Sequence, residues 1–120
     1  MVDFRIAVIG DKNFSDYGKV KSTLDSFIKI HNTKSVGIVS GDSGNTDLMA
    51  QQYADENGLS FECFPSDRGR YGNVAGYIKN KDMVNKSDRV IAFWNGHAGE
   101  TKHAIDEANK EGIPAYVVAP

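Results

Sequence analysis

Three glycine-rich turns combine small residues, hydroxyl groups and helix starts, the features that proteins use to bind phosphate. The segments IGDKNF (9–14), SGDSGNTD (40–47) and WNGHAGET (94–101) each follow a short apolar run and precede an amphipathic segment. If the apolar runs are parallel strands, these turns lie on one edge of a sheet, where backbone N–H groups and helix N-termini face one crevice. We therefore expect a site for a phosphate-bearing ligand there, with a nucleotide as the leading candidate.

The turn at 40–47 carries the strongest local signal for such a site. Gly41, Ser43 and Gly44 allow the backbone to approach a phosphate closely. The carboxylate of Asp42 would repel a phosphate, so we expect Asp42 to cap the following helix or to accept a hydrogen bond from a ribose hydroxyl. Asp47 can complement the helix dipole. An ordinary tight turn with a serine or asparagine cap explains the same residues equally well.

The turn at 94–101 offers Gly96 for close approach and the hydroxyl of Thr101 near a helix start. We expect Glu100 to stabilise that helix start by its charge. His97 and His103 are six residues apart, and no cysteine or paired carboxylate joins them at a ligand spacing, so we expect no metal site. His103 is interpreted as a helix residue that faces either the crevice or solvent.

The first turn and a basic stretch complete the candidate residues. Lys12 supplies a cation and Phe14 a possible base-stacking surface, whereas Asn13 fits an ordinary turn residue. The segment 65–84 is locally basic in a chain of net charge −2, which favours a phosphate-bearing ligand. For each single basic residue of that segment, a solvated surface position is the simpler interpretation.

Composition limits the protein class. A chain of 120 residues with 40% hydrophobic and 25% charged residues fits one globular domain, and a net charge of −2 disfavours nucleic-acid binding. No apolar run approaches the roughly 18 residues that span a bilayer, and we find no signal peptide, so we expect a cytoplasmic protein without a membrane partner. The single cysteine, Cys63, is expected to be a buried core residue.

Two alternating patterns of apolar residues along the chain predict the strands and helices that position these turns. Short apolar runs at 4–9, 35–40, 60–64, 89–94 and 115–119 predict strands, and amphipathic segments at 17–31, 45–57, 71–86 and 100–111 predict helices. Leu48 is expected on the inward face of the second helix, whereas Gly72 and Gly76 weaken the start of the third. The fold predicted is a single Rossmann-like three-layer α/β domain, with a five-stranded parallel sheet and helices on both faces.

Four segments, taken in order, resemble one protein family. GDKNF, SGDSGNTDLMA, YGNVAGYIKNKDM and FWNGHAGETKH are similar to the motifs of the SLOG superfamily, and within it to the small YspA-like group DUF2493. This resemblance covers nearly the whole chain. It implies a ligand crevice lined by Gly10, Lys12, Phe14, Gly41, Ser43, Gly44, Asp47, Tyr71, Gly72, Gly76, Asn80, Met83, Trp94, Gly96, Thr101 and His103, with Asn13, Asp42, Arg70 and Asn95 as further candidate ligand-binding residues.

The resemblance implies binding of a nucleotide or an ADP-ribose-like signalling molecule, linear or cyclic. SLOG domains are associated with sensing such signals in conflict systems between bacteria and viruses, so we expect a sensor or sequestering protein that needs no cofactor. Family members commonly self-associate, so a homo-oligomer is expected, with the segment 71–86 as a candidate surface.

Two departures from the family bear on catalysis. Ala98 and Glu100 replace a serine and a glycine of the late motif, which adds a negative charge beside the expected phosphate turn. The related LOG phosphoribohydrolases carry a pair of catalytic glutamates after their threonine, whereas this chain has Lys102 and His103 after Thr101. A nucleotide N-glycosidase or deoxyribosyltransferase remains an alternative, with Asp42, Asp47 or Glu100 as its acidic group. A scaffold protein with a vestigial crevice is the third interpretation.

Overall fold

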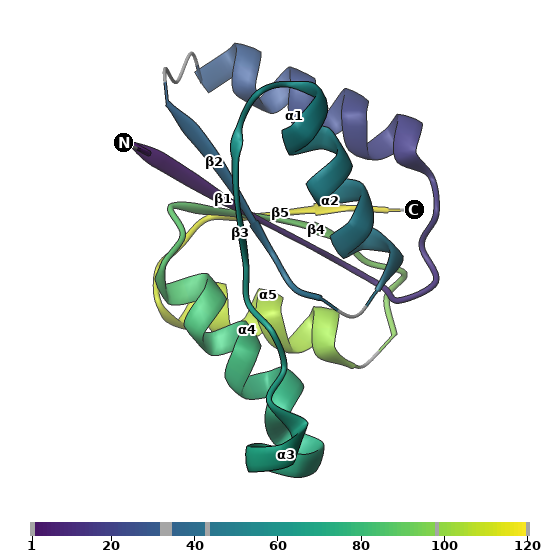
Figure 1. Cartoon of the computed structure of the whole chain (residues 1–120), viewed down its shortest axis with the longest axis vertical. Coiled ribbons are helices and arrows are strands. Elements are labelled where there is room, and N and C mark those ends of the chain that lie inside the picture. The colour runs from purple at the N-terminus through teal and green to yellow at the C-terminus, as the bar shows by residue number, and fades with distance from the viewer. Residues whose placement is uncertain (1, 32–34, 43, 98, 120) are drawn as a thin grey trace.

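The computed structural model describes residues 2–31, 35–42, 44–97 and 99–119. Five strands alternate with helices along the chain (Figure 1). The elements are β1 (Phe4–Gly10), α1 (Tyr17–His31), β2 (Val36–Ser40), α2 (Asn45–Glu56), β3 (Ser60–Cys63), α3 (Arg68–Tyr71), the 3-10 helix η1 (Gly72–Val74), α4 (Ala75–Asn85), β4 (Arg89–Phe93), α5 (Glu100–Lys110) and β5 (Ala115–Val118). All strand pairs are parallel and the order is β3-β2-β1-β4-β5, which confirms the predicted Rossmann-like α/β fold.

Helices cover both faces of the sheet, with α1 and α2 on one side and α4 and α5 on the other (Figure 1). Strand β1 contributes side chains to the apolar core on both faces of the sheet, because alternate side chains of a strand point to opposite faces. Ile6 and Val8 pack with Leu24 of α1, whereas Ala7 and Ile9 pack with Met83 of α4. Burial on both faces explains why the strands are continuous apolar runs without polar alternation.

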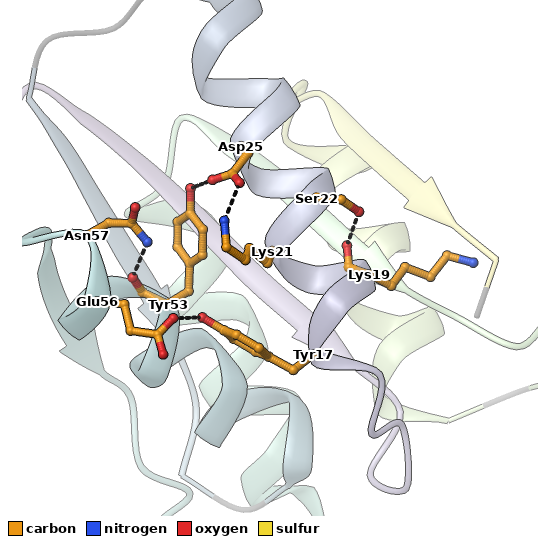
Figure 2. Close-up of polar contacts among 8 residues, drawn as sticks. All are labelled: Tyr17, Lys19, Lys21, Ser22, Asp25, Tyr53, Glu56 and Asn57. Carbon is orange, nitrogen blue, oxygen red and sulfur yellow. Dashed lines mark hydrogen bonds and ion pairs between the residues drawn. The ribbon is translucent and has the colours of Figure 1, made fainter.

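The interface between α1 and α2 is held by two tyrosines that reach carboxylates of the opposite helix (Figure 2). Tyr17 of α1 donates its hydroxyl to Glu56, and Tyr53 of α2 donates to Asp25 Oδ1 at 2.7 Å. Lys21 reaches the other oxygen of Asp25 at 2.7 Å. Polar side chains therefore join two helices whose apolar faces are packed on the sheet.

Strand order produces a crevice at one edge of the sheet. The chain leaves β1 towards β2 on one side, and β4 lies on the other side of β1, so the connections after β1 and β4 diverge. Such a switch point at the carboxyl ends of parallel strands is the usual ligand site in open α/β sheets. Helices α2 and α5 both begin at this edge, because each follows directly on the turn after its strand.

Three expectations about individual elements are corrected by the structure. The segment 71–86 is divided between the end of α3, η1 and α4, and α3 lies away from the sheet (Figure 1). Leu48 is 66% exposed, because α2 buries Met49 and Tyr53 together with small residues instead. Cys63 is exposed, because β3 is an edge strand whose side chains are only partly covered.

No helix within the described residues is both long enough and apolar enough to cross a membrane.

Candidate functional site

A cavity of about 150 Å³ lies at the carboxyl end of β1, at the switch point of the sheet. We call it the central cavity. Its walls come from both helical layers, since α2 contributes on one side and α4 and α5 on the other. The lining residues are Ile9, Gly10, Asp11, Lys12, Gly44, Asp47, Lys79, Asn80, Met83, Glu100 and Thr101.

The carboxylate of Asp47 occupies the glycine-rich turn after β2. Its Oδ1 accepts from the amide of Gly41 at 2.9 Å and its Oδ2 from the amide of Gly44 at 3.1 Å. The buried hydroxyl of Ser40 lies 2.6 Å from Oδ1. Gly44 is the N-cap of α2, so neither Asp42 nor an asparagine caps this helix as expected. The chain's own carboxylate thus takes the amides that were expected to bind a phosphate at this turn.

Lys79 is the functional candidate that sequence analysis missed. It is only 9% exposed, although each basic residue of its segment was expected to be solvated. Its Nζ lies 2.9 Å from the position that a β-carbon on Gly41 would take, and Asp47 Oδ2 lies 3.1 Å from the same point. The ammonium group therefore lies at the start of α2. Lys79 is the lysine of the motif YGNVAGYIKNKDM, directly before Asn80, and this position was the signal that could have revealed it.

Helix α4 approaches the start of α5 closely, which brings Glu100 to the central cavity. The Glu100 carboxylate lies directly against Gly76 of α4, in the space that a β-carbon on this glycine would take. Asn80 donates its Nδ2 to the backbone oxygen of Glu100 at 2.8 Å. Glu100 Oε1 lies 3.9 Å from Lys79 Nζ. Thr101 follows with only 5% of its surface exposed, at the cavity wall.

The turn after β1 is tied to the two other turns. A β-carbon on Gly10 would overlap the side chain of Thr46, so glycine permits the start of α2 to pack here. Asn45 donates its amide to the Lys12 oxygen at 3.2 Å. Asp11 Oδ2 accepts from the amide of Asn95 at 2.8 Å. These bonds hold the three turns in one arrangement, as the sequence predicted.

Two further cavities lie beside the central one and contain other predicted residues. The β1-side cavity, of about 390 Å³, shares Asp11 with the central cavity. It is lined by Asp11, Asn13, Phe14, Ser15, Asp16 and Asn95. The β3-side cavity, of about 280 Å³, shares Asp47. It is lined by Gly41, Asp42, Asp47, Leu48, Gln51, Phe61 and Cys63.

Phe14 is poorly placed for the expected stacking on a base. Its ring is 8% exposed and stacks on Phe93, with ring centroids 5.0 Å apart and an interplanar angle of 11°. Because Phe93 covers one face and burial covers most of the rest, Phe14 acts as a core residue in this structure.

Several predicted residues lie outside the lining of the three cavities. Arg70, Tyr71 and Gly72 belong to the α3–η1 segment, where the Arg70 guanidinium lies 5.2 Å from the Tyr71 ring centroid. Trp94 donates its Nε1 to the His97 oxygen at 2.6 Å. Further residues of this kind are Gly96, which has a φ of 93°, and His103, whose ring packs against Tyr77 with centroids 4.6 Å apart. Ser43 lies outside the described residues, as does Ala98.

The charges of the central cavity nearly balance. Asp11, Asp47 and Glu100 face Lys12 and Lys79. Asp11 and Asp47 accept from backbone amides, and the Glu100 carboxylate forms an ion pair of 3.9 Å with the buried ammonium of Lys79. Within the described ranges, no group of three or more histidine, cysteine, aspartate or glutamate residues could hold a metal ion.

These features define a class of protein: a Rossmann-like α/β protein with a small charged crevice at the switch point of its sheet. No protein-family model matches the chain, and no curated protein matches it significantly. The resemblance to the SLOG superfamily therefore stays a prediction that rests on the four motifs.

Proposed function

We propose that this protein binds a nucleotide or an ADP-ribose-like molecule at the central cavity, as a sensor or a sequestering protein. The observation that carries the proposal is the buried ammonium of Lys79. Burial of a charge is unfavourable unless the charge is paired and hydrogen-bonded. Glu100 Oε1 lies 3.9 Å away, beyond the 2.7–2.9 Å of a charge-assisted hydrogen bond. An anionic group of a ligand would complete the coordination of this cation.

We expect the phosphate group of the ligand to bind at the start of α5. The buried Thr101 can supply a hydroxyl there, and the first-turn amides of α5 supply the positive end of a helix. The turn after β2 is less suited, because Asp47 already accepts from its amides.

The volumes of the cavities suit a ligand whose phosphate and base occupy separate cavities. A cavity of about 150 Å³ is smaller than the roughly 300–1,000 Å³ of pockets for drug-sized ligands. It therefore suits a phosphate or a ribose phosphate, and the rest of a nucleotide would extend into a neighbouring cavity.

Isothermal titration calorimetry with AMP, ADP-ribose and cyclic ADP-ribose tests this proposal. Lys79→Met removes the ammonium group and keeps an unbranched side chain of similar shape, so we expect at least a tenfold loss of affinity, since bonds to charged groups contribute about 1.5–3 kcal/mol. The matched control is Lys81→Met, because Lys81 lies on the same helix but is exposed. Unchanged affinity in Lys79→Met, with an intact circular dichroism spectrum, would remove Lys79 from the site.

The N-glycosidase alternative has one observation in its favour. Two of the three candidate carboxylates, Asp47 and Glu100, line the central cavity, whereas Asp42 lines the β3-side cavity. Glu100 is the better candidate, because its side chain is 44% exposed and is not fixed by backbone amides. Chromatography of AMP incubated with the protein would reveal free adenine. Loss of this product in Glu100→Gln, with binding retained, would support the enzyme, and an absence of product from the wild-type protein would exclude it for AMP.

We also propose membership of the SLOG superfamily, a cytoplasmic location and a homo-oligomeric state. The oligomer would use the segment 71–86, where the apolar side chains of Val74 and Tyr77 are 50% and 42% exposed. Analytical ultracentrifugation of Val74→Asp against the wild-type protein tests this surface, and an unchanged sedimentation coefficient would exclude it.

A further inference from the structure

The β3-side cavity adjoins the central cavity at Asp47, which lines both. It opens between the first turns of α2 and the carboxyl end of β3. A ligand whose anionic group lies near Lys79 could therefore extend past Asp47 into this second space without leaving the protein surface.

Two apolar side chains border the β3-side cavity. Leu48 is 66% exposed, although apolar periodicity places it among the residues of α2 that pack inward. Phe61 is partly buried and packs against the core on the α1 and α2 side of the sheet. An exposed leucine next to an aromatic ring at the rim of a cavity is a surface that a flat apolar ligand can cover.

The polar side chains of this cavity are available to a ligand. Within the described part of the chain, neither Asp42 nor Gln51 makes a side-chain hydrogen bond or an ion pair. A carboxylate accepts N–H groups, and an amide both donates and accepts. Together they match the polar edge of a nucleobase.

The β1-side cavity is larger, but three of its polar side chains already accept hydrogen bonds from the backbone of this chain. Asn95 Oδ1 accepts from the amide of His97 at 2.9 Å, and Asp16 Oδ1 accepts from the amide of Lys19 at 3.0 Å. Asp11 is bonded to the amide of Asn95. These groups stabilise turns and a helix start, and the only ring in the lining, Phe14, is stacked on the core.

We propose that the heterocyclic base of the ligand lies in the β3-side cavity, against Leu48 and Phe61, with its polar edge towards Asp42 and Gln51. This inference rests on the proposed function, because it assumes that the anionic group of the same ligand lies at Lys79. The ligand class is then a nucleotide whose base presents at least one N–H group.

The single cysteine of the chain reports on this cavity, because Cys63 is exposed and lines it. The experiment measures the rate at which N-ethylmaleimide alkylates Cys63 with and without AMP. At about 100 times the Kd only about one molecule in a hundred is free, so AMP should slow alkylation by more than about tenfold. Ribose 5-phosphate, which lacks the base, should leave the rate unchanged at the same saturation.

A second single-cysteine protein serves as the matched control. Cys63→Ser combined with Asn13→Cys moves the only thiol to the β1-side cavity. Protection of Cys63 by AMP, without protection of the thiol at position 13, supports the inference. Protection at position 13 alone, or at neither position while calorimetry shows binding, overturns it.

A change in affinity gives an independent readout. Leu48→Ala should weaken binding of AMP severalfold and leave ribose 5-phosphate unaffected, whereas Ile30→Ala, at an exposed position of α1, should change neither. Equal affinity of the wild-type protein and Leu48→Ala for AMP would contradict the base position. If neither AMP nor ADP-ribose binds in calorimetry, the proposed function itself fails, and the base position fails with it.

Discussion

The ammonium of Lys79 lies 3.9 Å from Oε1 of Glu100, and the two side chains differ in exposure, at 8% and 44%. A buried cation thus faces a partly exposed carboxylate at the first residue of α5. If a ligand phosphate binds Lys79, it competes with Glu100 for the same charge.

Glu100→Gln should therefore bind AMP more tightly than the wild-type protein. Removing the competing charge should raise affinity by about two- to fivefold, which matches the roughly 0.5–1 kcal/mol of a partly exposed ion pair. Calorimetry at low ionic strength measures the change. Asp106→Asn is the control, because it removes the same charge from the exposed face of α5. A weaker affinity in Glu100→Gln would mean that Glu100 contacts the ligand directly.

Gly10→Ala should destabilise the fold. The new β-carbon would overlap the side chain of Thr46, which is 1% exposed and lies at the start of α2. Overpacking of this kind typically costs about 1–3 kcal/mol. Urea unfolding measures the loss. Gly18→Ala on α1 is the matched control, because its β-carbon meets only Asp16 at 3.4 Å, and the helix propensity of alanine should stabilise it by up to about 1 kcal/mol.

Asp47→Asn should lower stability through the turn after β2. An amide side chain keeps only one acceptor oxygen, so it cannot accept from both Gly41 and Gly44 as the carboxylate does. We expect a loss of about 0.5–2 kcal/mol, the usual range for a lost helix cap. The free energy of unfolding in urea checks this value. Asp55→Asn, at an exposed position of the same helix, should unfold like the wild-type protein.

Tyr17 should make stability pH-dependent in alkaline solution. Burial, followed by its hydrogen bond to Glu56, raises the pKa of the Tyr17 phenol to about 12. The folded state then holds this proton more tightly than the unfolded chain, whose tyrosine pKa is about 10. The stabilisation of the folded state by the protonated Tyr17 is complete below pH 10 and is lost as pH rises towards 12. Tyr17→Phe should unfold with a smaller pH dependence in this window, and tyrosinate absorbance should lose one late-titrating group. An unaltered late titration would contradict the assignment.

Asp42→Asn should make Cys63 more reactive. Although Cys63 is exposed, partial desolvation by the surrounding protein raises the pKa of its thiol, and the negative charges of Asp42 and Asp47 raise it further. Because the thiolate is the reacting form, removal of one charge should shift the pH profile of alkylation to lower pH. Glu62→Gln, which changes the charge of the residue beside Cys63, is the control. Identical profiles for Asp42→Asn and the wild-type protein would show that Asp42 does not face the thiol.

Local patterns in the sequence determined the elements of this protein almost completely. The predicted boundaries of all five strands, and of the helices α1, α2 and α5, agree with the structure to within one residue. The reason is physical: runs buried on both faces are apolar throughout, and Gly58 and Gly112, both with positive φ, follow the ends of α2 and α5. The parallel sheet followed from this alternation, because parallel strands need long crossovers.

Only the tertiary structure decided which side chains meet at the crevice. Periodicity placed both Leu48 and Met49 on the inward face of α2, but the helix buries Met49 with Ala50 and Ala54 on the sheet and leaves Leu48 exposed. Strand order made β3 an edge and exposed Cys63. Lys79 is buried between α4 and the turn that leads into α2, where its Nζ lies beside Gly41 of the other layer. These outcomes depend on contacts between segments far apart in the chain, which a local pattern does not encode.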